Sequence, residues 1–361
     1  GSNISRRKTA LHMYSTLRVS AITVIMLTIP LSGCLKNTEF VNGDENIDVN
    51  ENLRINHIQT KGTHNSYHLE PLISPTREYM YSHETLDIQA MNQGVRQFEI
   101  DVWWDLRDGL RVYHNQYDSG TTCATLEICL SVLLQWSSNN PSHHTIFIWI
   151  EPKDWPEQTA GVTTTVQFTE LLGDIESEID EFWPRNKSII PQDIQQNHSS
   201  LGQAIITEGW PLISESRGKA MFILLATGEM RDLYIQEYFP DGIMFPMFTS
   251  VQEAPVEARA FFSLTDPITD QSEIQQLVDD GFIVRTRADS GGQEADDNDN
   301  TRLMAALSSG AHSISTDYPA KVEDLDYWVD IPGGNPSRCN PVSAPPTCSS
   351  EDIESIHQEI T

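Results

Sequence analysis

The chain has 361 residues, of which 39% are hydrophobic and 21% are charged, with 20 glycines and 19 prolines. This composition is typical of a globular protein with a large core, and it excludes a disordered, collagen-like or coiled-coil chain. Lysine and arginine number 23 against 52 aspartates and glutamates, which leaves a formal net charge of −29 at pH 7. Because such a negative field repels phosphate backbones, we expect no nucleic-acid partner.

Residues 1–33 are typical of a bacterial lipoprotein signal peptide. Its basic region contains Arg6, Arg7, Lys8 and Arg18. An apolar stretch over residues 19–30 follows, too short for an ordinary membrane-spanning helix, and a cleavage site, Leu-Ser-Gly at residues 31–33, stands in front of Cys34. We therefore expect an exported protein with lipid on Cys34, anchored to the bacterial cell envelope (outer membrane or cell surface) or secreted. Residues 34–52 are polar and predict a flexible tether.

The four other cysteines form two closely spaced pairs, Cys123 with Cys129 and Cys339 with Cys348. Local pairs in an exported chain predict two disulfide loops, whereas a zinc site favours tighter C-x-x-C spacing. On one helix Cys123 and Cys129 would lie about 9 Å apart, too far to bridge. We therefore expect Cys123 in the loop before the helix.

From residue 53 onward, short apolar segments alternate with helical patterns. We expect strands at 55–62, 95–102, 145–150, 220–226, 242–248, 261–264, 282–287 and 312–316. We expect helices at 83–93, 124–137, 164–182, 229–237, 271–280 and 294–309, while 184–219 is irregular. Several strands are apolar on both faces, which is typical of a buried parallel sheet. The pattern predicts an α/β fold, a TIM-type (β/α)8 barrel, regular or distorted, over residues 53–330. Residues 331–361 are expected to form a C-terminal extension stapled by its own disulfide.

In such barrels the chemistry lies where strands end, so the polar residues there are the candidates for a site. The first strand leads into residues 63–67, Thr-His-Asn-Ser-Tyr. Glu99 and Asp101 in the second strand share one face because side chains alternate along a strand. Two carboxylates at a barrel mouth repel each other unless a cation lies between them. A short apolar piece then delivers His114, and the third strand ends at residues 151–153, Glu-Pro-Lys.

These strand ends supply oxygen ligands and two imidazoles. They are the amide of Asn65, the carboxylates of Glu99, Asp101 and Glu151, and the side chains of His64 and His114. Ligation by oxygen alone favours a hard cation, Ca2+ ahead of Mg2+, and leaves the histidines free for proton transfer. His143 and His144, which precede a strand, are expected to be exposed turn residues.

At these positions the chain resembles the calcium-dependent phosphoinositide-specific phospholipase C family, in particular its bacterial secreted branch among the TIM-barrel phosphatidylinositol phosphodiesterases. The resemblance covers about residues 53–320. It rests on residues 64–67 (HNSY), 98–101 (FEID), 113–114 (YH), Glu151, 284–289 (VRTRAD) and 315–319 (STDYP).

The resemblance implies a phosphoric diester hydrolase or lyase that acts on phosphatidylinositol, a related inositol phospholipid or a glycosylphosphatidylinositol anchor. Its implied calcium ligands are Asn65, Glu99, Asp101 and Glu151. The inositol 2-hydroxyl would attack phosphorus while Glu99 or Glu151 takes its proton. His64 would stabilise the pentacovalent phosphorus, and His114 would protonate the leaving diacylglycerol oxygen, leaving an inositol (cyclic) phosphate. Lys153 and Arg287 are candidate substrate-binding residues.

Three other functions remain open. A glycerophosphodiester phosphodiesterase should carry His-Arg-Gly after the first strand, where this chain has Asn65 and Ser66 after His64. A metal-independent lyase would need an arginine beside the second-strand aspartate, where Val102 and Trp103 stand. A non-catalytic surface lipoprotein that binds inositol lipids or glycans would have no use for a proton donor.

Overall fold

The computed structural model describes residues 52–105, 109–153, 165–334 and 336–354. The expectations for the signal peptide, for Cys34 and for nearly all of the tether concern residues outside these ranges. Within them, no helix combines the length and the apolar character that crossing a bilayer requires.

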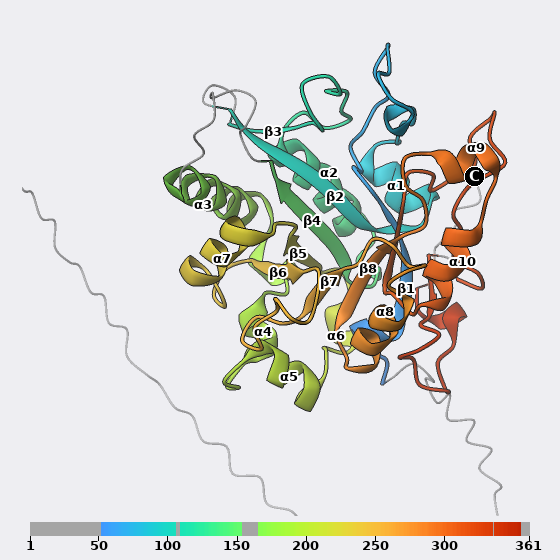
Figure 1. Cartoon of the computed structure of the whole chain (residues 1–361). Helices are drawn as coiled ribbons and strands as arrows, with labels where there is room; N and C mark the ends of the chain where they lie inside the picture. Colours follow the sequence, from blue (N-terminus) through green and yellow to red (C-terminus); the bar gives the residue numbers. More distant parts are fainter. Residues whose placement is uncertain (1–51, 106–108, 154–164, 335, 355–361) are drawn as a thin grey trace, which may run out of the picture. The chain divides into compact units, whose positions relative to one another are not determined.

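Eight parallel strands form a closed α/β barrel of the TIM type (Figure 1). They are β1 (Ile58–Thr63), β2 (Val95–Asp105), β4 (Ile146–Pro152), β5 (Ala220–Leu224), β6 (Met244–Phe248), β7 (Phe261–Ser263), β8 (Ile283–Arg287) and β9 (Ser313–Thr316). Each strand pairs with the next in this order, and β1 lies between β9 and β2. All eight predicted strands are present, so the predicted fold class is confirmed.

The barrel closes where β1 meets β2, and the closure depends on a glycine. Lys61 lies opposite Val95 and Gly62 opposite Gln97, with a shift of register between the two pairs. A Cβ atom on Gly62 would lie 2.0 Å from Oε1 of Gln97. Only a residue without a side chain fits this approach unless Gln97 moves.

Helices surround the barrel (Figure 1). Six of them match predicted helices: α1 (Leu86–Asn92), α2 (Leu126–Asn139), α3 (Thr165–Phe182), α7 (Gly228–Glu237), α8 (Gln271–Asp279) and α10 (Thr301–Ser308). The segment predicted as one helix over 294–309 is two, because Asn298 adopts a left-handed φ of 50° and ends α9 (Gln293–Asp297).

Short helices fill the remaining connections. The irregular segment holds α4 (Pro191–Gln195), α5 (Leu201–Glu208) and α6 (Ile213–Ser216). Single turns of 3₁₀ helix are η1 (Ile55–His57), η2 (Arg77–Tyr79), η3 (Arg185–Lys187) and η4 (Ser350–Asp352). Residues 249–260, all of them described, join β6 to β7 without an α-helix, so the barrel departs from a regular (β/α)8 pattern.

Two antiparallel strands that the sequence did not predict extend the sheet. β3 (Gly109–Val112) returns along β2, and β10 (Ser337–Cys339) pairs with β1. The C-terminal extension therefore joins the sheet directly. Both predicted disulfides are present, Cys339 with Cys348 and Cys123 with Cys129. As expected, Cys123 precedes α2 while Cys129 lies within it.

Alternation along β4 explains how the core is divided. Ile146, Ile148 and Ile150 pack outward in one cluster with residues of α2 and α3. Phe147 and Trp149 belong to a second cluster, and both meet Phe261 edge-on at ring distances of 5.9 and 6.2 Å. Aromatic side chains thus fill the barrel beneath its polar end.

The prediction that His143 and His144 are exposed is wrong, because both are fully buried. The His143 ring stacks on Trp136, and Nε2 of His144 lies 2.7 Å from Oγ of Ser337. Burial lowers the pKa of each imidazole to about 4. The residues that cover them come from α2 and from the C-terminal extension, which a local sequence pattern does not reveal.

Candidate active site

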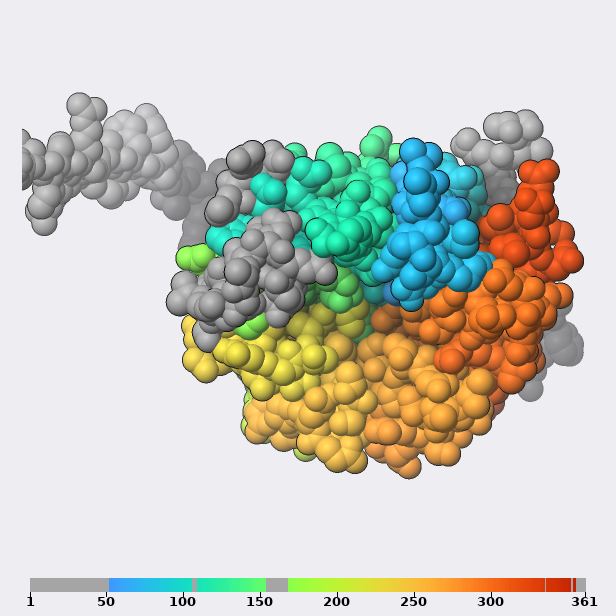
Figure 2. All heavy atoms as spheres, turned by 45° about the horizontal axis from the view of Figure 1, so that its top comes forward, coloured from blue at the N-terminus to red at the C-terminus, as the bar shows by residue number. Residues whose placement is uncertain are grey.

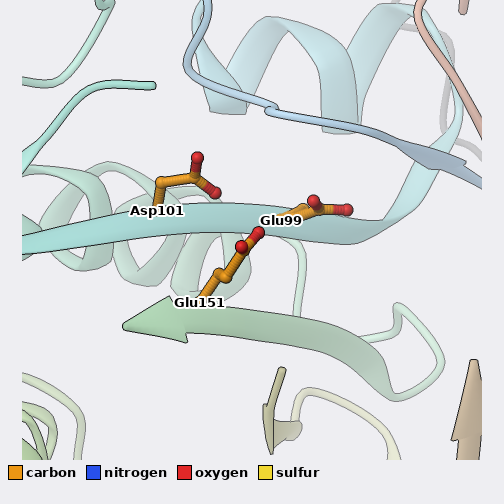
Figure 3. A group of neighbouring side chains, drawn as sticks. All are labelled: Glu99, Asp101 and Glu151. Atoms are coloured by element: carbon orange, nitrogen blue, oxygen red, sulfur yellow. The ribbon is translucent and has the colours of Figure 1, made fainter. Parts of the chain in front are cut away.

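Three carboxylates converge where β2 and β4 approach the mouth of the barrel. Glu99 and Asp101 stand on the same face of β2, and the parallel register places Glu151 of β4 beside Asp101. One oxygen from each lies within 4.8 Å of the others. Figure 3 shows Glu151 near the carboxyl end of β4, directed toward Glu99. The predicted convergence of these side chains is therefore present.

Two cations neutralise part of this negative charge. Arg285 of β8 forms a buried ion pair with Glu99. The Lys153 Nζ atom lies 2.8 Å from Oδ2 of Asp101 and 2.6 Å from Oε1 of Glu151. Lys153 was predicted to bind substrate, and its ammonium group here contacts two of the predicted metal ligands.

The surroundings shift the pKa values of Glu99 and Asp101, the two carboxylates of β2, in opposite directions. Burial opposes the charge of Glu99, but Arg285 and other nearby cations hold the pKa of Glu99 below its usual value. Burial and the neighbouring Glu151 raise the pKa of Asp101 well above its usual value. The neighbouring Lys153 opposes this rise.

The donors at this position suit a calcium ion, because they are oxygens that carry negative charge. The fourth predicted ligand, Asn65, follows β1 with a left-handed φ of 45° and a buried side chain that hydrogen-bonds to Tyr81. The next residue, Ser66, donates its backbone N–H to the carbonyl of Glu99 at 2.9 Å. The end of β1 is thus fastened against β2 at the carboxylate cluster, while ligation by Asn65 stays a prediction.

His64 lies between this cluster and the ends of β8 and β9. Its Nδ1 is 2.8 Å from Oδ1 of Asp317, and its Nε2 is 3.8 Å from Oε1 of Glu99. Burial opposes the charge of Asp317, but Arg287 and His64 keep the pKa of Asp317 far below its usual value. Asp317 therefore orients the imidazole and directs Nε2 toward Glu99. Our sequence reasoning did not assign Asp317, although it lies in the STDYP segment of the resemblance.

Arg287, the other predicted substrate-binding residue, already has carboxylate partners. Its guanidinium lies 2.9 Å from Oδ2 of Asp317 and 3.9 Å from Oδ1 of Asp289. Burial and the nearby Asp317 raise the pKa of Asp289 to about 7. Arg287 thus couples the ends of β8 and β9 as well as lining the mouth.

A cavity of about 830 Å³ opens at this end of the barrel. Figure 2 shows the surface hollowed where segments from distant parts of the sequence meet. Five predicted site residues line the cavity: His64, Glu99, Glu151, Lys153 and Arg287. Its volume lies within the range of small-molecule sites. The structure thus brings predicted residues in or next to four strands, β1, β2, β4 and β8, into one cavity with Arg285, which we had not assigned.

His114 is not among the residues that line the cavity. A chain of hydrogen bonds through Asp118 and His68 connects it to the segment that follows β1. Nδ1 of His114 lies 2.9 Å from Oδ2 of Asp118, and Nε2 of His68 lies 2.8 Å from Oδ1 of the same aspartate. The backbone N–H of His68 donates to the carbonyl of Asn65. Asp118 thus connects His114 to the segment that follows β1. Sequence reasoning missed Asp118, whose only signal was its four-residue distance from His114.

A sequence profile described as phosphoinositide phospholipase C, Ca2+-dependent, matches residues 53–115 and 106–341. Among curated proteins, none matches the chain.

Solved structures share the fold. The calcium-dependent phosphoinositol-specific phospholipase C of a Pseudomonas species, in its apo form, is 18% identical with a TM-score of 0.53, and the match covers 81% of this chain and 97% of that one. A structure of the Pseudomonas protein described as a myoinositol complex is 18% identical with a TM-score of 0.52, covering 74% and 91%. The Ca2+-dependent enzyme from Streptomyces antibioticus is 16% identical with a TM-score of 0.52, covering 74% and 95%.

Proposed function

The chain belongs to the Ca2+-dependent phosphoinositide phospholipase C family, and from that premise we propose that it cleaves phosphatidylinositol-type lipids by attack of the inositol 2-hydroxyl on phosphorus. The products are diacylglycerol and an inositol (cyclic) phosphate. The observation that carries the proposal is the convergence of Glu99, Asp101 and Glu151 beside His64 at the mouth of a closed barrel.

The residues that would hold the calcium ion are Asn65, Glu99, Asp101 and Glu151. When bound, the ion supplies Lewis-acid chemistry that lowers the pKa of the attacking hydroxyl and neutralises charge on the phosphoryl oxygens. Glu151 is the better placed of the two candidate bases, because its side chain is 31% exposed in the cavity whereas that of Glu99 is only 3% exposed. A carboxylate within hydrogen-bond reach of the inositol 2-hydroxyl accepts its proton.

The two histidines act at opposite ends of the reaction. His64, held at Nδ1 by Asp317, presents Nε2 to the cavity, where a positioned N–H donor stabilises charge that develops on the phosphoryl oxygens. His114, held at Nδ1 by Asp118, keeps Nε2 to protonate the leaving oxygen of diacylglycerol.

The chemistry of the cavity and its surroundings suits the inositol, phosphate and lipid parts of the proposed substrate. The Pseudomonas structure described as a myoinositol complex supports the idea that this fold accepts an inositol ring. Arg287 and Lys153 line the cavity and suit a phosphate or sugar hydroxyls. Leu72 and Ile73, in the segment between β1 and α1, are almost fully exposed to solvent. Most of Tyr117 is exposed as well. Exposed apolar side chains on segments that follow strand ends favour contact with a lipid surface.

We also propose that the protein is exported and lipid-anchored through Cys34. The support is the basic and apolar pattern before Cys34 together with the two disulfides, which persist in oxidising compartments. Mass spectrometry of the mature N-terminal peptide tests this: a diacylated Cys34 is expected, and an intact peptide spanning residues 19–45 would contradict it.

Turnover of headgroup-labelled phosphatidylinositol tests the catalytic proposal. Vesicles are incubated with the protein in Ca2+, in excess chelator and after Ca2+ is restored, and the products are separated. We expect labelled inositol cyclic phosphate or inositol phosphate only when Ca2+ is present. Absence of cleavage would favour the alternative of a non-catalytic protein that binds inositol lipids or glycans. Cleavage that continues in excess chelator would contradict the proposed role of Ca2+. Glycerophosphoinositol, which lacks acyl chains, tests the glycerophosphodiesterase alternative in parallel.

A further inference from the structure

Lys153 places its ammonium group on the carboxylates that would hold the metal. Its Nζ bridges Asp101 and Glu151 at 2.8 and 2.6 Å, and its side chain is 18% exposed. Its backbone N–H donates to the carbonyl of Val102 at 2.8 Å, which fixes the start of the side chain beside β2. An ammonium group beside carboxylate oxygens is attracted by the same negative charges that would attract a metal ion to them.

The other cation of the cluster is fixed more firmly. Arg285 is 3% exposed, donates toward the hydroxyls of Ser263 and Ser315, and lies over the ring of Trp149 at 5.4 Å. Lys153, by contrast, lines the cavity on a flexible four-carbon side chain. Lys153 is therefore the cation that can leave.

The charge count shows what its departure would do. Three carboxylates against Arg285 and Lys153 leave one negative charge. A divalent cation added to the same set makes the total one positive charge, and the displaced ammonium group remains at the cavity. A phosphodiester carries one negative charge, so these three carboxylates and their cations together repel it without the metal and attract it with the metal bound.

We propose that Lys153 and Ca2+ compete for Asp101 and Glu151. Lys153 is the internal counter-ion that keeps the carboxylates together without the metal, and metal binding releases its ammonium group toward the substrate phosphate. This inference rests on the calcium site of the proposed function and deepens it, because it makes phosphate binding depend on the metal through a residue that is not a metal ligand.

Calcium titration of the full chain, stripped with chelator and followed by calorimetry, tests the competition. Lys153→Met removes the charge and keeps most of the side-chain volume. Lys219→Met is the matched control, because Lys219 precedes β5 and lies at the opposite end of the barrel. We expect Lys153→Met to bind Ca2+ about tenfold more tightly or better, and Lys219→Met to match the unaltered protein. Equal or weaker binding by Lys153→Met overturns the inference alone, whereas absence of Ca2+ binding by the unaltered protein overturns the proposed calcium site as well.

Thermal unfolding provides a second readout that needs no activity. In chelator, Lys153→Met should unfold several degrees below the unaltered protein, because three carboxylates then face one cation. Saturating Ca2+ should raise the Tm of Lys153→Met by more than it raises the Tm of the unaltered protein. An equal rise in both proteins would contradict the counter-ion role. If Lys153→Met does not fold without metal, Lys153→Gln is measured in the same way.

Discussion

Replacing His114 with alanine tests whether this residue delivers a proton to the leaving group. A positioned general acid contributes roughly 10²–10⁴-fold, and we expect cleavage of phosphatidylinositol to slow by that factor. The imidazole contacts Asp118 at 2.9 Å and Tyr79 edge-on at 5.2 Å. Its loss should cost about 1.5–3 kcal/mol of folding stability, the value of one hydrogen bond to a charged group. None of these contacts involves the three clustered carboxylates, so Ca2+ binding should not change.

The assay compares two leaving groups. Diacylglycerol leaves as a poor alkoxide and needs a proton, whereas the phenolate of an aryl inositol phosphate leaves unaided, since phenols such as tyrosine have a pKa of about 10. His114→Ala should therefore lose most of its kcat on the lipid and little on the aryl ester. His198→Ala is the control, because this half-buried histidine lies 3.7 Å from Glu208 between α4 and α5.

Two results would refute the assignment of His114. Full turnover of the lipid by His114→Ala would show that another group supplies the proton. An equal loss of activity on both substrates, with Ca2+ binding retained, would assign His114 to substrate positioning instead.

Three further substitutions test the site, an ion pair and the closure of the barrel. Asp101→Asn should weaken Ca2+ binding by about tenfold or more, because a ligand loses its charge; an unchanged titration would place the metal elsewhere. Glu354→Gln tests a pH dependence of stability. Burial opposes ionisation of Glu354, but Arg96 lowers the pKa of this carboxyl group from 4.5 to about 2. The stability that the ion pair contributes is therefore fully present above pH 4.5 and is lost as the pH falls toward 2. The variant should be about 3 kcal/mol less stable at pH 7, with a flatter acid limb of unfolding, and an unaltered limb would contradict the linkage. Gly62→Ala should cost about 1–3 kcal/mol in urea unfolding, because its Cβ would collide with Gln97; full stability would mean that Gln97 moves freely.

Local patterns predicted the barrel strands because each is a short apolar segment bounded by polar residues. The same reasoning missed β3 and β10, which have four and three residues in polar or proline-rich surroundings. Their pairing partners, β2 and β1, make them strands, and a three-residue segment carries no periodicity of its own. The short helices α4 and α6 escaped prediction for a similar reason, since packing stabilises them more than propensity does.

Within the site, alternation placed Glu99 and Asp101 on one face, and parallel register explains why Glu151 joins them. Sequence could not assign Arg285 to Glu99, because the two residues are 186 positions apart and meet only when the barrel closes. The same holds for Asp317, which orients His64 across the junction of β1 and β9.

The sequence alone determined which acidic and histidine side chains are candidates for the site, since strand alternation and residue type are local properties of the chain. The tertiary structure decided which charged groups are paired: it placed Lys153 beside Asp101 and Glu151, Arg285 beside Glu99, and Asp118 beside His114. The physical reason is that side-chain electrostatics depend on distances of a few ångströms between segments far apart in the chain. Those distances exist only once β1 closes against β2 and the strand ends come together.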